Sequence, residues 1–243
     1  MPAKNSTKIY IENGYYHLYN RGVEKRTIFM DTQDYSVFLS FLKEYLMPKN
    51  EKKLLERLSD PNTTSKEKGK ILKLLRLNNF HEEITLLCYC LMPNHFHFFV
   101  KQKSIGTIDK FMNSMGTRYT MYFNKKHKRV GSLYQDVYKA VLVTKEEQFL
   151  HLSRYIHKQA LKSKNQVSSY LDYVGTRKTA WVSTDDILSY FSKKNPNLSR
   201  LHFIMSPTRN GLLNQHIFYG FPSFRSPSAK ELIQFPHVCA KGC

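Results

Sequence analysis

Two histidines separated by one apolar residue, His95-Phe96-His97, have the type and spacing in this chain that most directly suggest chemistry. On a β-strand, side chains alternate between the two faces, so both imidazoles would project to one side and Phe96 to the other. Two neutral imidazoles on one face can provide two ligands to a divalent metal ion. The pattern equally fits a strand whose histidines face solvent or hydrogen-bond within the fold, since the chain has 10 histidines.

A second set of polar side chains lies on a predicted helix that begins near Thr144 and contains QFLHLSRYIHKQALK. Thr144 and Glu147 have the spacing of a capping box, which marks the start of a helix. His151, Tyr155 and Gln159 follow one another at intervals of four residues, so they form one stripe along this helix. The stripe places a tyrosine and an amide side chain one turn apart.

Together the two features suggest attack on a phosphodiester. A tyrosine hydroxyl has a pKa near 10, so it needs help to lose its proton and a cation to neutralise charge on the phosphate. A divalent metal held by His95 and His97 would act as that cation, and Gln159 could supply a third, oxygen ligand. The alternative from the residues alone is that Tyr155 is an ordinary half-buried aromatic residue and Gln159 a surface residue.

The charge of the chain indicates a polyanionic partner. Against 19 Asp and Glu stand 38 Lys and Arg, for a formal net charge of +19 over 243 residues. The basic residues are spread along the chain among 16 Tyr and 16 Phe. This composition suits a surface on which aromatic rings stack on unpaired bases while cations contact phosphates. A membrane surface is a weaker candidate, because no long helix combines a lysine-rich face with a clean apolar one.

The sequence predicts a soluble, intracellular protein. Its first residues lack the apolar region of a signal peptide, and no stretch is long and apolar enough to span a bilayer. Four cysteines do not form a disulfide framework in a chain of this size. We expect Cys88 and Cys90 to be buried in a strand, and Cys239 and Cys243 to be free thiols near the C-terminus.

Hydrophobic periodicity predicts the elements that must position these residues. Strands are expected at 14–21, at 84–100 with a bend at Pro93, and at 138–143, and helices at 31–46, 110–124, from 144, and at 184–191. The lysine-rich segment that follows the first helix is broken by Asp60-Pro61-Asn62, which indicates a solvated insertion of short helices.

Several segments, in order along the chain, resemble the single-tyrosine HUH transposases, in particular the REP-associated tyrosine transposases and related insertion-sequence transposases. They are YYHLYNRGVEKRTIFMD, LMPNHFHFFV, TRYTMYFNKKHKRVGSLYQDVYKAVLV, SRYIH and SSYLDYVG. The resemblance covers residues 10–192. Several motifs in this order are far more specific than a single His-x-His pair.

The resemblance implies a metal-dependent transposase that nicks and rejoins single-stranded DNA. His95 and His97 would bind Mg²⁺ or Mn²⁺, Gln159 would take the position of the third ligand, and Tyr155 would be the nucleophile. Its attack would give a 5′-phosphotyrosine link and a free 3′-hydroxyl that later reverses the reaction. The expected partner is single-stranded DNA with hairpin structure at the ends of a mobile element. Proteins of this kind include homodimers and monomers.

One position departs from the family pattern. Many relatives read Tyr-Ile-His-x-Asn-Pro after the nucleophile, whereas this chain reads YIHKQA over residues 155–160. Glutamine keeps the amide oxygen of asparagine on a longer side chain, and loss of the proline lets the helix continue. The alternative function is therefore a non-catalytic or domesticated single-stranded nucleic-acid binding protein on the same scaffold. A third is an RNA-processing nuclease.

We expect an α+β fold: a central, mainly antiparallel sheet of ferredoxin-like or RRM-like form, with helices packed mostly on one face. The catalytic domain would span residues 1–194, including a lysine-rich helical insertion at about 48–80, and residues 195–243 would be a C-terminal appendage. We expect the protein in the cytoplasm, associated with a prokaryotic nucleoid.

Basic residues near the predicted motifs are candidates for DNA contact. They are Arg21, Arg118, Lys125, Lys126, Lys128, Arg129, Lys139 and Arg154. The run KKHKR that contains four of them is the strongest local candidate for phosphate binding, and it equally fits a solvated run of charge.

Overall fold

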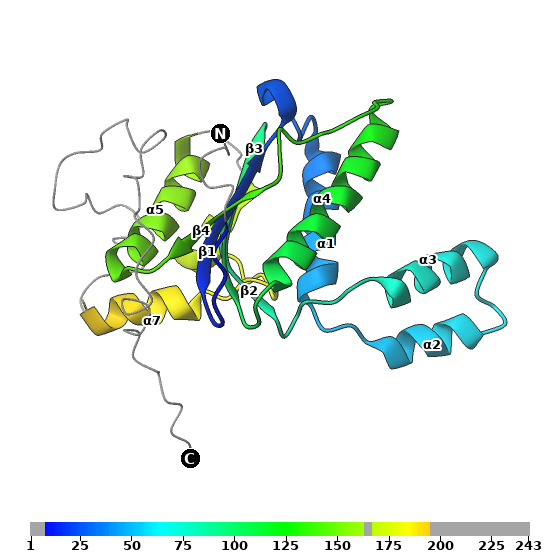
Figure 1. The fold of residues 1–243 in the computed structure, drawn as a ribbon. Helices are drawn as coiled ribbons and strands as arrows, with labels where there is room; N and C mark the ends of the chain where they lie inside the picture. Colours follow the sequence, from blue (N-terminus) through cyan, green and yellow to red (C-terminus); the bar gives the residue numbers. More distant parts are fainter. Residues whose placement is uncertain (1–7, 163–166, 195–243) are drawn as a thin grey trace, which may run out of the picture. The chain divides into compact units, whose positions relative to one another are not determined.

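A single antiparallel sheet organises the computed structural model, which describes residues 8–162 and 167–194 (Figure 1). Within these residues five strands pair in the order β4-β1-β3-β2-β5. They are β1 (Tyr15–Arg21), β2 (Ile84–Met92), β3 (His95–Gln102), β4 (Lys139–Val143) and β5 (Val167–Ser168). The order β4-β1-β3-β2 is that of the ferredoxin-like split βαβ motif. The predicted α+β fold is confirmed.

The helices cover both faces of this sheet. They are α1 (Thr32–Leu46), α2 (Glu51–Ser59), α3 (Ser65–Arg76), α4 (Thr107–Lys126), α5 (Glu146–Lys162), α6 (Tyr170–Val174) and α7 (Asp185–Lys194), and a 3₁₀ turn, η1 (Val23–Lys25), follows β1. Figure 1 shows α1 and α4 on one side of the sheet and α5 on the other. The expectation that helices pack mostly on one face is corrected here. The physical reason is that β2 and β3 are apolar on both faces, so each face needs a cover.

Two separate cores result from this arrangement. Phe96 and Phe98 of β3 face α1 and α4, where they pack with residues such as Phe38. Phe99 faces the other way and joins a second core with Ile156 of α5. Strand β3 is therefore buried on both sides at the centre of the sheet.

The predicted boundaries agree closely with the observed elements. The bend expected at Pro93 separates β2 from β3, and the helix expected at 31–46 is α1, whose N-cap side chain, Asp31, accepts from the Asp34 amide. The start of α5 differs in detail: the side chain of Gln148, rather than Glu147, accepts from the amides of Thr144 and Lys145. The packing of the apolar face of α5 against the sheet stabilises this helix, so its position does not depend on which residue caps it.

The segment 48–80 contains α2 and α3, which pack chiefly against each other. Figure 1 shows this helix pair extending away from the sheet. At its base, the Lys49 Nζ donates to the carbonyls of Leu75 (2.9 Å) and Leu77 (3.1 Å). The pair therefore leaves and re-enters the fold at one place.

Some expectations fall beyond the described residues. The C-terminal appendage at 195–243 lies there with Cys239 and Cys243, whereas Cys88 and Cys90 are buried free thiols, as expected. None of the described helices is long and apolar enough to cross a bilayer.

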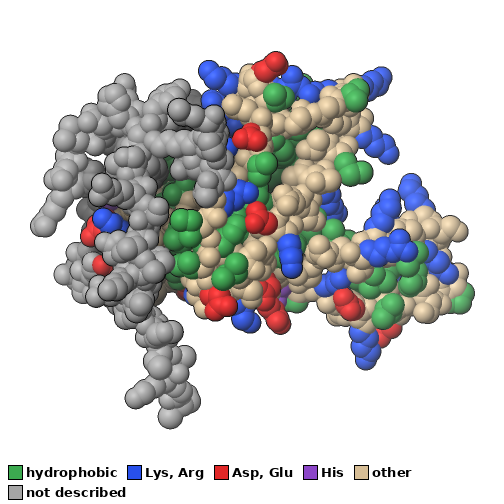
Figure 2. Space-filling model, viewed as in Figure 1, with side chains coloured by type: hydrophobic (Ala, Val, Ile, Leu, Met, Phe, Trp, Pro, Cys, Tyr) green, Lys and Arg blue, Asp and Glu red, His purple; other side chains and the backbone are tan. Residues whose placement is uncertain are grey.

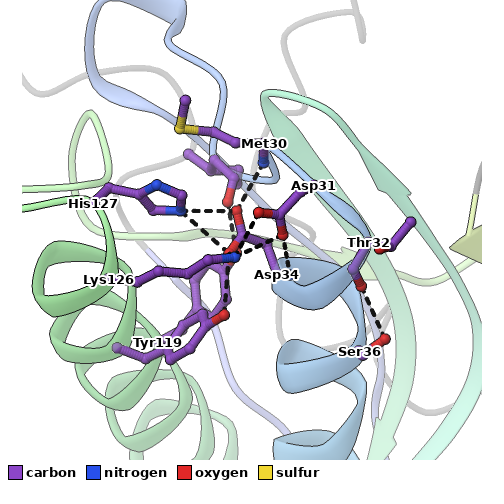
Figure 3. Close-up of polar contacts among 10 residues, drawn as sticks. Met30, Asp31, Thr32, Asp34, Ser36, Tyr119, Lys126 and His127 are labelled. Atoms are coloured by element: carbon purple, nitrogen blue, oxygen red, sulfur yellow. Dashed lines mark hydrogen bonds and ion pairs between the residues drawn. The ribbon is translucent and has the colours of Figure 1, made fainter.

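A buried carboxylate joins the beginning of α1 to the end of α4 (Figure 3). The Asp34 side chain has no solvent exposure and accepts from the Met30 amide (2.8 Å) and the Lys126 Nζ (2.8 Å), while the His127 Nε2 lies 3.1 Å away. Burial raises the pKa of Asp34, but these hydrogen bonds outweigh burial, so its pKa lies below the ordinary range. The cluster fixes the turn that follows α4.

Replacement of Asp34 by asparagine should destabilise the protein by on the order of 3 kcal/mol, because it removes the buried partner of Lys126. Since the folded-state pKa of Asp34 is depressed, its contribution is present above pH 5 and is lost as the pH falls through that pKa. Urea unfolding of wild type and Asp34→Asn should therefore show a stability gap that narrows between pH 5 and pH 3.

Asp31→Asn is the matched control. Asp31 contacts the same Lys126 but is exposed, and asparagine is also a good N-cap, so this change should have little effect. Equal losses in the two variants, or a gap for Asp34→Asn that does not depend on pH, would contradict this assignment.

Candidate active site

The two histidines of the His-x-His motif lie at the beginning of β3, on the face covered by α5. Their ring centroids are 4.9 Å apart and the rings are perpendicular, at 88°. His95 pairs with Arg21 of β1 and His97 with Tyr19, so β1 residues of the same face flank them. The predicted projection of both imidazoles to one side of a strand is confirmed.

Each histidine uses one ring nitrogen within the fold. The His95 Nδ1 lies 2.6 Å from the Asn94 Oδ1, while the Asn94 Nδ2 donates to the Lys25 carbonyl at 3.2 Å. Because an amide oxygen only accepts, His95 carries its proton on Nδ1 and a lone pair on Nε2. The His97 Nδ1 lies 2.9 Å from the Nε2 of a third histidine, His17.

The remaining nitrogens are the ones that matter for metal binding. The Nε2 atoms of His95 and His97 are buried and have no hydrogen-bond partner among the described residues. A proton on the His97 Nδ1, donated to His17, would leave the His97 Nε2 with a free lone pair as well. In metal sites the ring nitrogen that does not bind the metal commonly donates a hydrogen bond in the same way, which fixes the orientation of the ring.

Burial keeps these imidazoles neutral. It lowers the pKa of His17 to about 3 and that of His95 to about 4, where the positive charge of Arg21 adds to the effect. Burial also holds the pKa of His97 well below its usual value, with smaller contributions from its two histidine neighbours. At neutral pH all three rings are therefore available as lone-pair donors.

Helix α5 places Tyr155 beside the histidines. The apolar side chains of Leu152 and Ile156 fix this helix in the second core. The Tyr155 ring centroid then lies 5.6 Å from that of His97 and 6.3 Å from that of His17. Burial raises the pKa of the Tyr155 hydroxyl to about 12, so the tyrosine is protonated at neutral pH.

Gln159 is buried one helical turn beyond Tyr155, at 5% exposure. Interaction with the Gln159 side chain lowers the pKa of Tyr155 and so opposes the larger effect of burial. His151, on the same predicted stripe, is exposed, so the stripe contributes two of its three members to the site.

The donor set fits a divalent cation, on condition that Gln159 contributes. The described residues hold no group of three or more His, Cys, Asp and Glu side chains that could bind a metal. The candidate ligand atoms are the buried Nε2 atoms of His95 and His97 and the amide oxygen of Gln159. Such a set leaves coordination positions for water and for a phosphate oxygen.

Comparison with known proteins finds one matching family. Residues 46–159, just under half of the chain, match the family model described as "Transposase IS200 like". This segment of the chain is therefore similar to the IS200-like transposases. The matched segment contains His95, His97, Tyr155 and Gln159, and it ends at the last of these.

Two solved structures resemble this chain. One is a REP-associated tyrosine transposase bound to a REP hairpin, at 10% identity and a TM-score of 0.38, with 66% of this chain and 74% of that chain covered. The other is described as a transposase of Deinococcus radiodurans R1, at 13% identity and a TM-score of 0.34, covering 63% and 96%. No curated protein matches the chain.

His17 is the residue of the candidate site that sequence reasoning missed. It lies in the YYHLYNR segment, two residues before Tyr19, which pairs directly with His97. The alternation of side chains along β1 indicates which face His17 occupies, but only the pairing of β1 with β3 shows that this face is next to the His-x-His motif. A single histidine on a strand does not indicate a site unless the neighbouring strand is known.

Three of the eight basic candidates lie on or beside the face of the sheet that carries the histidines. Arg21 is exposed and pairs with His95, and Lys139 pairs with Tyr19 on the next strand while its Nζ lies 3.0 Å from Asp136. Arg154 directly precedes Tyr155 and is partly buried, which lowers its pKa. Arg21 is the best placed of the three to meet a phosphate near the histidines.

The other five candidates lie on α4 or on the turn after it. The Arg118 Nη2 is 2.5 Å from a Glu44 carboxylate oxygen, and its guanidinium lies 3.8 Å from the centre of the Phe41 ring. Lys126 is held by Asp31 and Asp34, as described above, and the Arg129 guanidinium donates to Asn124. Lys125 and Lys128 are exposed. The structure does not bring this group to the histidine pair.

His17→Ala should weaken the binding of Mn²⁺ by about 10- to 100-fold, because it removes the group that orients the His97 ring. Isothermal titration calorimetry of the protein without DNA would measure this. His81→Ala, at an exposed histidine far along the chain, is the control and should bind as the wild type does. Unchanged affinity in His17→Ala would remove His17 from the site.

Proposed function

We propose that this protein is a transposase that nicks and rejoins single-stranded DNA through Tyr155, with a divalent metal held by His95 and His97. One observation carries the proposal. Two buried imidazole nitrogens without a hydrogen-bond partner among the described residues belong to a histidine pair beside a partly buried tyrosine, with 5.6 Å between the His97 and Tyr155 ring centroids. A purely structural strand would satisfy such nitrogens or expose them.

In the proposed reaction, the Tyr155 hydroxyl attacks a phosphodiester of the DNA. The Tyr155 oxygen forms a bond to phosphorus while the bond from phosphorus to the 3′ oxygen breaks, and the tyrosine proton passes through solvent to that oxygen. The products are a 5′-phosphotyrosine and a free 3′-hydroxyl. Because one ester replaces another, the attack of a 3′-hydroxyl reverses the step without an energy source.

Three side chains would hold the cation: His95 and His97 through Nε2, and Gln159 through its amide oxygen. Mg²⁺ or Mn²⁺ bound there would supply Lewis-acid neutralisation of charge on the phosphate. Gln159 would have a second task, since a hydrogen bond from its amide N–H to the Tyr155 oxygen would favour the ionised phenol, in line with the lowering effect of Gln159 on the Tyr155 pKa. One glutamine therefore links the ligand set to the nucleophile.

The proposed substrate is single-stranded DNA with a hairpin, and a homodimer is one possible assembly. Arg21, exposed at the end of β1 beside His95, would bind the phosphate next to the scissile one. The net charge of +19 supports a polyanionic substrate of this kind.

Tyr155→Phe should abolish covalent attachment to DNA, because no other hydroxyl stands at this position. The assay uses a 5′- or 3′-labelled hairpin oligonucleotide from the flanking sequence of the gene, with Mg²⁺ or Mn²⁺, and detects a protein–DNA adduct on denaturing gels. Tyr134→Phe is the matched control, since its buried hydroxyl has no hydrogen-bond partner among the described residues, and it should leave the adduct intact.

The result also separates the alternatives. Wild-type protein that binds the hairpin but yields no adduct with either metal would refute the enzyme and leave a single-stranded DNA-binding protein on the same scaffold. Cleavage that requires a 2′-hydroxyl would instead identify an RNA-processing nuclease.

Gln159→Leu should lower the rate of adduct formation by about 100-fold, the effect expected on losing one preorganised polar partner of the reacting group. Mn²⁺ affinity of the DNA-free protein separates the two tasks of this residue. A lower affinity indicates ligation by the amide oxygen, whereas a slower rate at unchanged affinity leaves only the hydrogen bond to Tyr155. A variant that keeps both rate and affinity would contradict any role for Gln159.

A further inference from the structure

The helix pair α2 and α3, residues 51–76, which we call the arm, carries a cationic surface that the proposed chemistry does not use. We infer that the arm binds the phosphate backbone of double-stranded DNA and holds the paired stem of a hairpin substrate. This role rests on the proposed function, because only a hairpin presents a duplex beside the single strand that Tyr155 would cut. Figure 1 shows the arm extending away from the sheet, as a separate contact would require.

The arm has twice as many basic as acidic residues. Its basic residues are Lys52, Lys53, Arg57, Lys66, Lys68, Lys70, Lys73 and Arg76, against Glu51, Glu56, Asp60 and Glu67. All eight except Lys68 are exposed, and Figure 2 shows Lys and Arg side chains around this projection. Two of the acids are already engaged: Glu51 pairs with Lys49, and Glu67 forms a capping box with Thr64.

The cations of the arm differ from several on the sheet and its helices. Arg118, Lys126 and Lys139 each form an ion pair with a carboxylate of the same chain. Within the part of the chain that the structure describes, the eight arm residues form no ion pair within 4.0 Å. Like charges spaced three or four residues apart destabilise a helix, so this pattern is costly unless a polyanion neutralises it.

The spacing of the charges on α3 suits a phosphate backbone. Lys66, Lys70 and Lys73 recur at i, i+4 and i+7, so they share one face and span about 10 Å of helix. Duplex DNA carries one charge per about 1.7 Å of its axis, so this face can meet several phosphates. Three exposed lysines on one face can neutralise several neighbouring phosphates, whereas a single lysine can neutralise only one.

Gly69 adds an observation that is independent of charge. It lies inside α3 on the same side as these lysines, although glycine weakens a helix. Apart from its chain neighbours and the backbone of α3 itself, no atom lies within 4 Å of where its Cβ would be, so packing within the protein does not require a glycine there. Absence of a side chain would let a phosphate approach the helix backbone between the lysines.

A second copy of this chain is the rival occupant, since Leu55 and Leu72 of the arm are 52% and 41% exposed. Single exposed leucines are common on protein surfaces. Two arms of like charge would also repel each other on contact. The charge of the arm therefore favours DNA over self-association.

The test is the triple variant Lys66→Gln, Lys70→Gln, Lys73→Gln in the full chain, with the Tyr155→Phe change added so that no DNA is cut. Binding is measured without metal, over a range of salt, to a hairpin oligonucleotide with about one helical turn of stem. We expect binding about tenfold weaker or more at low salt, and a slope of log K against log[salt] that is smaller by about 2–3. Binding to the loop strand alone should not change.

Lys103→Gln, Lys110→Gln, Lys178→Gln is the matched control, since these lysines are exposed, lie outside the arm and carry the same total charge. An equal loss in this control would show a non-specific effect of net charge and overturn the role of the arm. So would an unchanged salt slope in the arm variant, or a dimer in the wild type that becomes a monomer in the variant. Failure of wild-type protein to form an adduct would refute the cleavage chemistry and leave this binding result standing.

Discussion

The position of β3 in the middle of the sheet is the constraint on which the rest of the structure depends. Because β1 and β2 pair with it on either side, every second residue faces α1 and α4, and the others face α5. Phe96 and Phe98 thus belong to one core, while His95 and His97 lie on the opposite face. The same alternation that builds the core also brings two imidazoles below the helix that carries Tyr155.

Burial of histidines in an apolar layer has to be balanced by hydrogen bonds. Each of the three histidine rings of this layer has at least one partner, and the Asn94 contact settles which nitrogen of His95 is protonated. The two nitrogens left without partners are those that a metal would use. The electrostatics of the layer therefore favour neutral rings with a defined direction of their lone pairs.

Much of this could be predicted from local patterns. Alternation gave the strand of His95, and four-residue spacing gave the side of α5 that carries Tyr155 and Gln159. Strand pairing joins distant segments, so the position of His17 beside the motif could not be predicted. The sequence of β2 is apolar on both faces, but the prediction placed helices mostly on one side of the sheet. The partners of Arg118 and Lys126 likewise come from α1, which sequence spacing alone cannot bring to α4. The sequence therefore predicts the types of the elements, whereas the contacts between distant segments require the structure.

Asn94 connects the turn after β1 to the first histidine of β3. Its side chain accepts from the His95 ring and donates to the Lys25 carbonyl, and its own carbonyl accepts from the Gly22 amide. The basic turn after β1 and the imidazole of His95 are thus mechanically coupled through one residue. A displacement of that turn would therefore act on the orientation of the His95 ring through hydrogen bonds alone, without any change in the pairing of the strands.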